Sequence, residues 1–265
     1  MITDDHAHLD HKWLLDKFEN ISNYINLQEK NGVKYIIANS MDIESSKLSL
    51  EMAKKHKIIL PAIGLYPIDE NYRESINDRN AEFKPNYAEI DDYLAWIKGN
   101  ISKSVALGEV GLDYSNDLCH KESQKYVFSK LVDLAVSKNI PLIIHSRKAE
   151  ADILEILNDK NAKKVVLHCF SGKKTLINEA KKRKYYFSIP TSIVRSQHFQ
   201  MIANDIDVSR ILTETDAPFM SPYKDQEPNE SRFIIESLKI ISKIKNMDIE
   251  ETQKVIFQNF QKLYL

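Results

Sequence analysis

The sequence has few cysteines, few glycines and no long hydrophobic run. Its two cysteines, Cys119 and Cys169, are too few for a disulfide framework, so we exclude a disulfide-stapled secreted domain and expect a reducing compartment. No apolar stretch approaches the roughly 20 residues that a membrane-spanning helix needs. The first residues are acidic and contain no apolar signal core, so we expect a cytoplasmic protein without a membrane anchor.

An excess of charge of either sign is also lacking, since the formal net charge is −1. Such a chain has no global field that would steer nucleic acid or a membrane to it, so a polyanionic substrate must be held locally. At 265 residues the chain is long for one ordinary domain, although α/β barrels reach this size as one unit. We see no linker, repeat or low-complexity tract and no feature that indicates an obligate protein partner. We therefore predict a single domain over residues 1–265.

What the sequence does contain is a series of short apolar segments. They cover residues 1–7, 33–40, 58–65, 104–110, 141–146, 164–170, 185–190 and 209–216. Their apolar residues are nearly continuous, which is typical of parallel strands buried on both faces. Amphipathic stretches separate them; in residues 125–139, for example, Val127, Phe128 and Leu131 share one helical face. This alternation predicts a (β/α)8 TIM barrel, with a doubly wound open sheet as the alternative.

The glycines are concentrated at one end of this predicted barrel. Four of the six, Gly64, Gly108, Gly111 and Gly172, lie at or just beyond expected strand ends. The C-terminal ends of barrel strands carry the active site, and glycine there allows a close approach of the backbone. The glycine pattern therefore indicates a functional site at this end.

His6 and His8 stand one residue apart at the end of the first expected strand. Alternate side chains of a strand point to the same face, so the two imidazoles would lie side by side. Two neutral imidazoles in that arrangement are half of a typical site for zinc, manganese or iron. The remaining ligands must come from elsewhere in the chain.

Other polar residues end the later strands and supply these ligands. Burying so many histidines and carboxylates at one barrel mouth would be very costly unless they were paired or bound to metal. One catalytic ion uses about three protein ligands, whereas a pair of ions about 3.5–4 Å apart and bridged by a carboxylate accounts for six. The candidate metal ligands are His6, His8, Glu109, His145, His168 and Asp216, with Glu214 close to the last of them.

The segments DDHAHLD, GEVGLDY, IIHSRKA, HCFSG and ETDAP carry a family resemblance. In order and spacing they resemble the motifs of the TatD family of metal-dependent DNases, and the resemblance covers essentially the whole chain. It implies an amidohydrolase-like barrel with two divalent ions (Zn, Mg or Mn) that cleaves phosphodiester bonds in DNA, often from the 3′ end. Single-stranded DNA or 3′ ends would be the substrate.

The resemblance also distributes the ligands between the two ions. His6, His8 and Asp216 would bind the first ion and Glu109 would bridge, while His145 and His168 would bind the second. Two ions activate water and stabilise the leaving oxygen of a phosphodiester.

Further residues near these motifs are candidates for roles in the reaction. Asp216 would orient the metal-activated water or take its proton, with Glu214 assisting. Arg147 would clamp a phosphate by bidentate hydrogen bonds. Lys173, which follows HCFSG directly, would reach the substrate backbone.

The sequence departs from the family pattern where a substrate would be contacted. Tyr66 in AIGLYP stands where the family leads us to expect histidine, although a tyrosine hydroxyl still donates to phosphate. The segment SPYKDQEPNES lacks the arginine expected before its Glu-Pro. The sequence shows no basic stretch interleaved with aromatic residues of the kind that would indicate a groove for single strands. Two alternatives therefore stay open: a hydrolase of another ester or amide bond, such as a lactone or an aminoacyl-tRNA, and a catalytically silent metal-binding scaffold.

Overall fold

The structure, a computed structural model, describes residues 1–67, 87–115, 120–223 and 228–265. Eight parallel strands form one sheet in which the spatial order is the order along the chain. This order confirms the predicted (β/α)8 barrel. The strands are β1 (Ile2–Ala7), β2 (Val33–Ala38), β3 (Ile59–Leu65), β4 (Ala106–Asp113), β5 (Leu142–Arg147), β6 (Val165–His168), β7 (Tyr186–Pro190) and β8 (Ile211–Glu214).

The first and last strands meet and nearly close the sheet into a barrel. Ala7 at the end of β1 forms a parallel bridge with Ala217, just beyond β8. Next to this bridge, the backbone N–H of Asp216 donates to the carbonyl oxygen of His6 at 2.9 Å. An open doubly wound sheet would leave β1 and β8 without such bonds, so that alternative is wrong.

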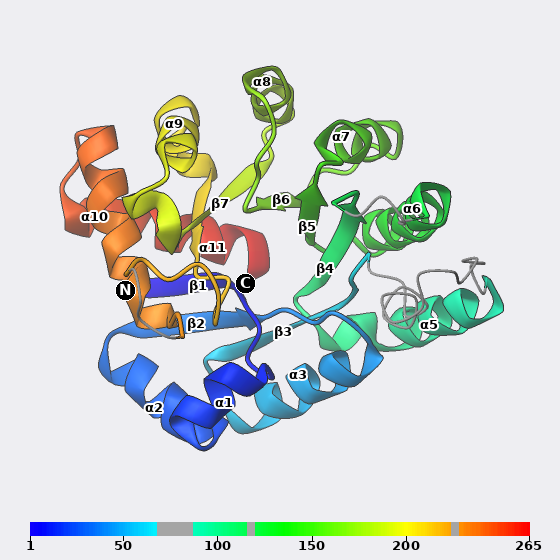
Figure 1. Ribbon diagram of the computed structural model, residues 1–265, viewed down its shortest axis with the longest axis horizontal. Helices are drawn as coiled ribbons and strands as arrows, with labels where there is room; N and C mark the ends of the chain where they lie inside the picture. The colour runs from blue at the N-terminus through cyan, green and yellow to red at the C-terminus, as the bar shows by residue number, and fades with distance from the viewer. Residues whose placement is uncertain (68–86, 116–119, 224–227) are drawn as a thin grey trace.

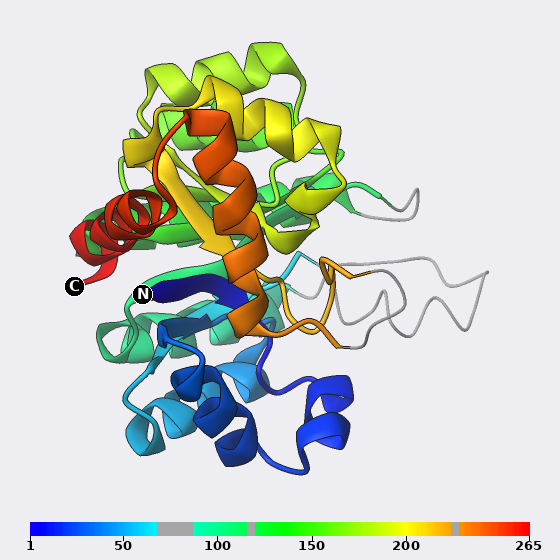
Figure 2. The same ribbon diagram turned by 90° about the vertical axis from the view of Figure 1, so that its left-hand side faces the viewer.

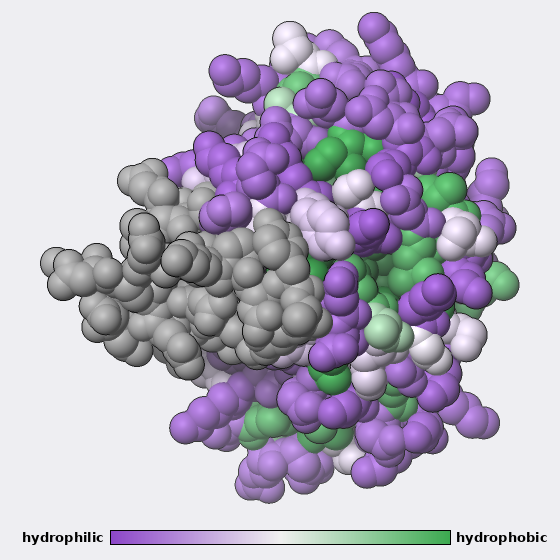
Figure 3. Space-filling model, turned by 90° about the vertical axis from the view of Figure 1, so that its right-hand side faces the viewer, coloured by the Kyte–Doolittle hydropathy of each residue, from purple (hydrophilic) through white to green (hydrophobic). Residues whose placement is uncertain are grey.

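Helices surround the strands, as the view along the barrel shows (Figure 1). The outer face that carries α5 to α7 is mostly hydrophilic, with hydrophobic residues in small areas (Figure 3). The described helices are α1 (Lys12–Phe18), α2 (Ile21–Lys30), α3 (Ile43–Lys55), α5 (Tyr87–Asn100), α6 (Lys121–Lys138), α7 (Glu150–Asp159), α8 (Lys174–Lys182), α9 (Gln197–Asp205), α10 (Ile234–Lys245) and α11 (Ile249–Tyr264). None of these described helices has the length and apolar character of a membrane span.

The barrel interior has an apolar layer at its N-terminal end. Strands β2 to β8 each contribute one buried side chain to it: Ile37, Ala62, Ala106, Ile143, Val166, Tyr186 and Leu212. The end of α11 closes this layer from below with Phe260, Leu263 and Tyr264. Figure 2 shows α11 at the end of the barrel where the strands begin. The candidate metal ligands at the strand ends therefore lie at the opposite end of the barrel.

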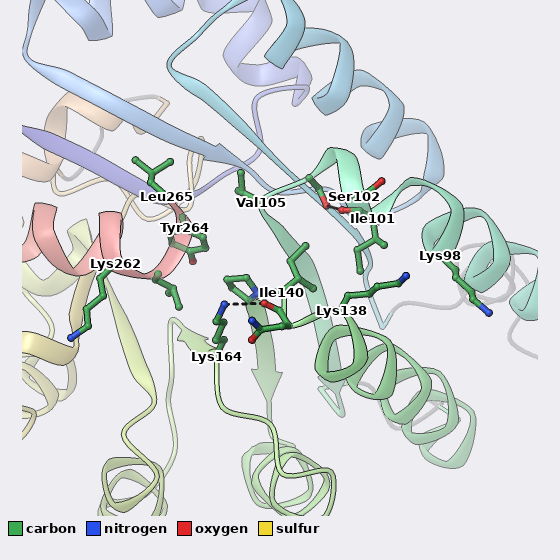
Figure 4. Close-up of a pocket in the computed structure, with 14 residues that line it drawn as sticks. Lys98, Ile101, Ser102, Val105, Lys138, Ile140, Lys164, Lys262, Tyr264 and Leu265 are labelled. Carbon is green, nitrogen blue, oxygen red and sulfur yellow. Dashed lines mark hydrogen bonds between the residues drawn. The ribbon is translucent and has the colours of Figure 1, made fainter.

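A surface pocket of about 560 Å³ lies beside the end of α11 (Figure 4). Four lysines line it, Lys98, Lys138, Lys164 and Lys262, and the Lys164 ammonium donates to the carbonyl oxygen of Asn139 at 2.9 Å. This pocket is at the N-terminal end of the barrel, so it is separate from the site described next.

Candidate metal centre

The polar side chains at the C-terminal ends of β1, β4, β5, β6 and β8 meet in the barrel mouth. Close packing of the backbone makes this possible. A Cβ atom at Gly111 would lie 1.9 Å from the carbonyl oxygen of His145, and one at Gly64 would lie 2.6 Å from the backbone nitrogen of Glu109. Only glycine fits at such distances. This explains Gly111, the second glycine of GEVGLDY, and the close approach of the strands places Glu109 next to His145.

Four side-chain atoms from β1, β4 and the end of β8 form the first donor group. The Nε2 atoms of His6 and His8 are 3.3 Å apart, and they lie 3.4 and 3.5 Å from Glu109 Oε2. Asp216 Oδ1 lies 3.8 Å from His6 Nε2 and 3.5 Å from His8 Nε2. A tetrahedral ion with ligands at about 2.1 Å separates those ligands by about 3.4 Å. The donor spacing therefore fits one divalent ion.

The second donor group uses the other oxygen of Glu109. Its Oε1 atom lies 2.8 Å from Nδ1 of His145 and 3.8 Å from Nε2 of His168. One ligand atom from each of these three residues lies within 4.8 Å of the others. Glu109 thus faces a donor group with each of its oxygens, as a bridging carboxylate would.

The charge of this cluster suits a cation. Burial would raise the pKa of Glu109, but His6 and His145 hold it well below its usual range, so the carboxylate is ionised. For His6, burial and the neighbouring His168 lower the pKa, which favours the neutral imidazole that binds metal. A cation bound among these nitrogen donors would stabilise the buried Glu109 carboxylate.

His168 is held by Glu214. Its Nδ1 lies 2.9 Å from Glu214 Oε2, which leaves Nε2 toward Glu109. Burial alone would lower the pKa of His168, but the Glu214 carboxylate raises it to about 10. The other oxygen of Glu214 accepts from the backbone N–H of Cys169 at 3.1 Å and from its thiol at 2.9 Å. Both oxygens are thus engaged, and Glu214 orients His168 instead of facing the open mouth.

Asp113 plays the corresponding part for His145, and sequence reasoning missed it. Its Oδ2 lies 3.1 Å from Nε2 of His145, and the Tyr66 hydroxyl donates to the same oxygen at 3.2 Å. The Tyr66 hydroxyl is also 3.1 Å from His145 Nε2, and the two rings pack 4.6 Å apart. The signal was present in GEVGLDY, because Asp113 ends the strand that carries Glu109. Carboxylates behind ligating histidines fix ring orientation.

The other predicted residues lie at the rim of the mouth. Arg147 at the end of β5 and Lys173 before α8 are both exposed. The positive charge of Arg147 acts on the Tyr66 hydroxyl, where it partly counteracts the rise in pKa that burial causes. Burial and Glu214 raise the pKa of the Cys169 thiol well above the usual value, which favours the protonated thiol over the nucleophilic thiolate.

A parallel barrel whose mouth gathers four histidines and several carboxylates defines the class of metal-dependent hydrolases. The chain belongs to the TatD family: the family model described as TatD related DNase matches residues 3–265.

Similar proteins agree with this assignment. A Bacillus subtilis protein named uncharacterized metal-dependent hydrolase YabD is 30% identical, with 100% of this chain and 99% of that protein covered. Human deoxyribonuclease TATDN3 is 29% identical, with 99% and 94% covered. Among solved structures, the Escherichia coli TatD homologue YJJV matches with a TM-score of 0.84 at 21% identity, covering 99% of this chain and 97% of that chain. The last comparison supports the fold alone.

Proposed function

We propose that the protein is a deoxyribonuclease that cleaves DNA phosphodiester bonds with two divalent ions in the barrel mouth. The observation that carries the proposal is the position of Glu109, which presents Oε2 to His6 and His8 and Oε1 to His145. His6, His8 and Asp216 would hold one ion, while His145 and His168 would hold the other. Two adjacent cations are the usual arrangement for phosphodiester hydrolysis.

Divalent ions held there would supply Lewis acidity, polarising a phosphoryl oxygen and making water a better nucleophile near neutral pH. Asp216 would orient the attacking water and accept its proton on a carboxylate oxygen. Its side chain is 17% exposed and is reached by solvent, whereas the side chain of Glu214 is fully buried. We therefore assign Glu214 the role of a positioning residue for His168, in place of the expected role beside Asp216.

Three residues at the mouth would contact the substrate. Arg147 would bind a phosphate through its guanidinium group, and Lys173 would attract the strand beyond it. Tyr66 would face the phosphate with its hydroxyl, which in the structure donates a hydrogen bond to Asp113. These roles place the scissile phosphate between Glu109 and the exposed rim.

The choice of DNA is supported by the name of the human relative, a deoxyribonuclease. We propose single strands or 3′ ends as the substrate and 3′–5′ exonuclease action. The use of Tyr66 where the family pattern has histidine favours a second candidate, hydrolysis of another ester or amide bond in the same centre. We further propose that the protein works in the cytoplasm, where Cys169 would remain the free thiol that the structure contains.

Digestion of a 5′-labelled single-stranded oligonucleotide tests the proposal. Reactions with magnesium, manganese and zinc, with chelator, and with the Asp216→Asn variant would run side by side. We expect a metal-dependent ladder, and a loss of at least about 100-fold in the variant while its circular dichroism spectrum is unchanged.

Metal content of the variant separates the roles of Asp216. Loss of turnover with both ions retained assigns Asp216 to the water, whereas loss of one ion assigns it mainly to binding. Absence of cleavage with every metal, together with turnover of an ester or aminoacyl-tRNA, would replace the deoxyribonuclease with the second candidate.

A further inference from the structure

Aromatic side chains lie at the rim of the mouth, next to the first donor group. The Phe219 ring centre is 6.5 Å from that of His8, a candidate metal ligand. It is also 5.1 Å from the ring of His11 and 6.5 Å from that of Trp13. We call His11, Trp13 and Phe219 the aromatic ledge. The sequence alone assigns no role to these three residues.

Two of the three rings of the aromatic ledge, those of Trp13 and Phe219, are exposed although they are large and apolar. Phe219 is 42% exposed and Trp13 is 37% exposed. Many other aromatic side chains of the described residues are buried in the cores, and burial of such a ring is favourable. Exposed apolar side chains that cluster beside a site typically mark a surface that contacts a ligand.

The backbone fixes the aromatic ledge to the metal centre on two sides. Phe219 follows Asp216 by three residues, and its N–H donates to the Asp216 carbonyl oxygen at 2.8 Å. The N–H of His8 donates to the carbonyl oxygen of Ala217 at 2.8 Å. On the other side, the Nδ1 atom of His11 accepts from the N–H of Trp13 at 3.1 Å at the start of α1. Figure 2 shows α1 on the side of the barrel where the strands end.

We propose that the aromatic ledge stacks the terminal nucleobase of a DNA strand whose scissile phosphate lies at the metal centre. The proposal rests on the proposed function and deepens it. In a nucleotide, one sugar separates the flat base from the phosphate. In the structure, the Phe219 ring of the aromatic ledge is the direct neighbour of His8, with 6.5 Å between the ring centres. Stacking on aromatic rings is sequence-tolerant, because every base has a π-face. The ledge therefore selects for a base without selecting which base.

The first experiment compares two single-stranded oligonucleotides that differ only in the last nucleotide, which carries a base or is abasic. For the unmodified protein we expect kcat/KM to be about 10-fold higher with the base, the scale of one stacking contact. Phe219→Ala should reduce this ratio to about 1, and Phe219→Leu should do the same because leucine has no π-face. Phe219→Trp should preserve the ratio. Val136→Ala, at a 44% exposed position on α6, is the matched control and should leave it unchanged.

Thermal unfolding shows whether each variant is folded. We expect all of the Phe219 variants to be folded, because Phe219 is exposed. A ratio near 1 in the unmodified protein would overturn the proposal. So would a Phe219→Ala variant that keeps the full preference for a base.

A binding measurement separates failure of the aromatic ledge from failure of the proposed function. The protein loaded with manganese or zinc would be titrated with thymidine 5′-monophosphate and with deoxyribose 5-phosphate, neither of which contains a phosphodiester bond. Fluorescence of Trp13 would report binding in a Trp96→Phe background, since these are the only two tryptophans.

Tighter binding of the nucleotide, by about 10-fold and dependent on Phe219, supports the aromatic ledge even where DNA is not cleaved. Equal binding of the two compounds overturns the aromatic ledge even where DNA is cleaved.

Discussion

Asp113 and His145 form a carboxylate–imidazole pair, with Oδ2 and Nε2 3.1 Å apart. The pair turns Nδ1 of His145 toward Glu109, at 2.8 Å. Burial would raise the pKa of Asp113, but His145 and Ser115 hold it below its usual range, so the carboxylate is ionised. An ionised partner keeps the ring in one orientation and strengthens its ligating nitrogen.

Asp113→Asn should therefore weaken metal binding. Loss of such a partner lowers metal affinity by about 10- to 100-fold, and Tyr66→Phe should have a smaller effect because it removes one hydrogen bond to Asp113. Titration calorimetry or competition with a chelator measures the affinity. Asp152→Asn is a matched control, because Asp152 pairs with Lys125 and Tyr114 outside the donor groups. Unchanged affinity in Asp113→Asn would show that the pair does not tune the centre.

Metal binding should release protons. The Glu214 carboxylate raises the pKa of His168 to about 10 despite burial, so His168 is protonated at pH 7 without a metal ion. Binding an ion through Nε2 removes that proton, so affinity should increase as the pH rises toward 10. Calorimetry in two buffers with different ionisation enthalpies counts the protons released. Glu214→Gln should release fewer, since the pKa of His168 falls, and equal heats in both buffers would contradict the prediction.

Acid should destabilise the protein partly through Glu230. Its fully buried carboxylate lies 2.9 Å from Lys17 and 2.7 Å from Nε of Arg232. Burial opposes ionisation, but these two cations lower the pKa of Glu230 below its usual value. The unfolded chain therefore binds the proton more readily, so this contribution is present above about pH 4.3 and is lost as the pH falls through the folded value.

Urea denaturation between pH 3 and pH 7 measures this effect. Glu230→Gln should cost about 1–3 kcal/mol at pH 7, and its stability should fall less steeply on acidification than that of the unmodified protein. Glu44→Gln, at an exposed ion pair on α3, should behave like the unmodified protein. Parallel acid profiles for the unmodified protein and Glu230→Gln would refute the assignment.

The end of α11 should be essential for stability. Phe260 is fully buried under the barrel and packs 5.8 Å from the ring of Tyr35 and 4.9 Å from that of Tyr264. Phe260→Ala should lower the free energy of unfolding by about 3–5 kcal/mol, since it opens a cavity. Phe257→Ala, at a partly exposed position on the same helix, should cost less. Chemical denaturation measures the free energy of unfolding of both variants. Equal losses would argue against a stabilising role for Phe260 at the N-terminal end of the barrel.

The barrel and its polar strand ends could be predicted because both depend on local patterns. His6 lies in β1 and His8 directly follows it, and Glu109 lies within one recognisable motif. The hydrogen bond from Tyr66 to Asp113 spans 47 residues and depends on how β3 packs against β4. No periodicity in the sequence encodes such a pairing.

Position in the sequence does not show which way a side chain points near the end of β8. Glu214 lies two residues before Asp216, so both appeared to serve the same water. In the structure the Glu214 side chain is fully buried and pairs with His168, whereas the Asp216 side chain is 17% exposed. The contact between Trp13 and Phe219 likewise arises only when β8 meets β1.

That meeting of β1 and β8 has a consequence for the order of folding. The first donor group combines His6 and His8, from β1 and the residue after it, with Asp216, which follows β8. These side chains are far apart in the sequence, so they come together only when the first and last strands meet. A chain truncated before β8 lacks the bridge between Ala7 and Ala217 as well as Asp216. Closure of the barrel and assembly of the first donor group are therefore one event, and a barrel that has not closed leaves the group incomplete.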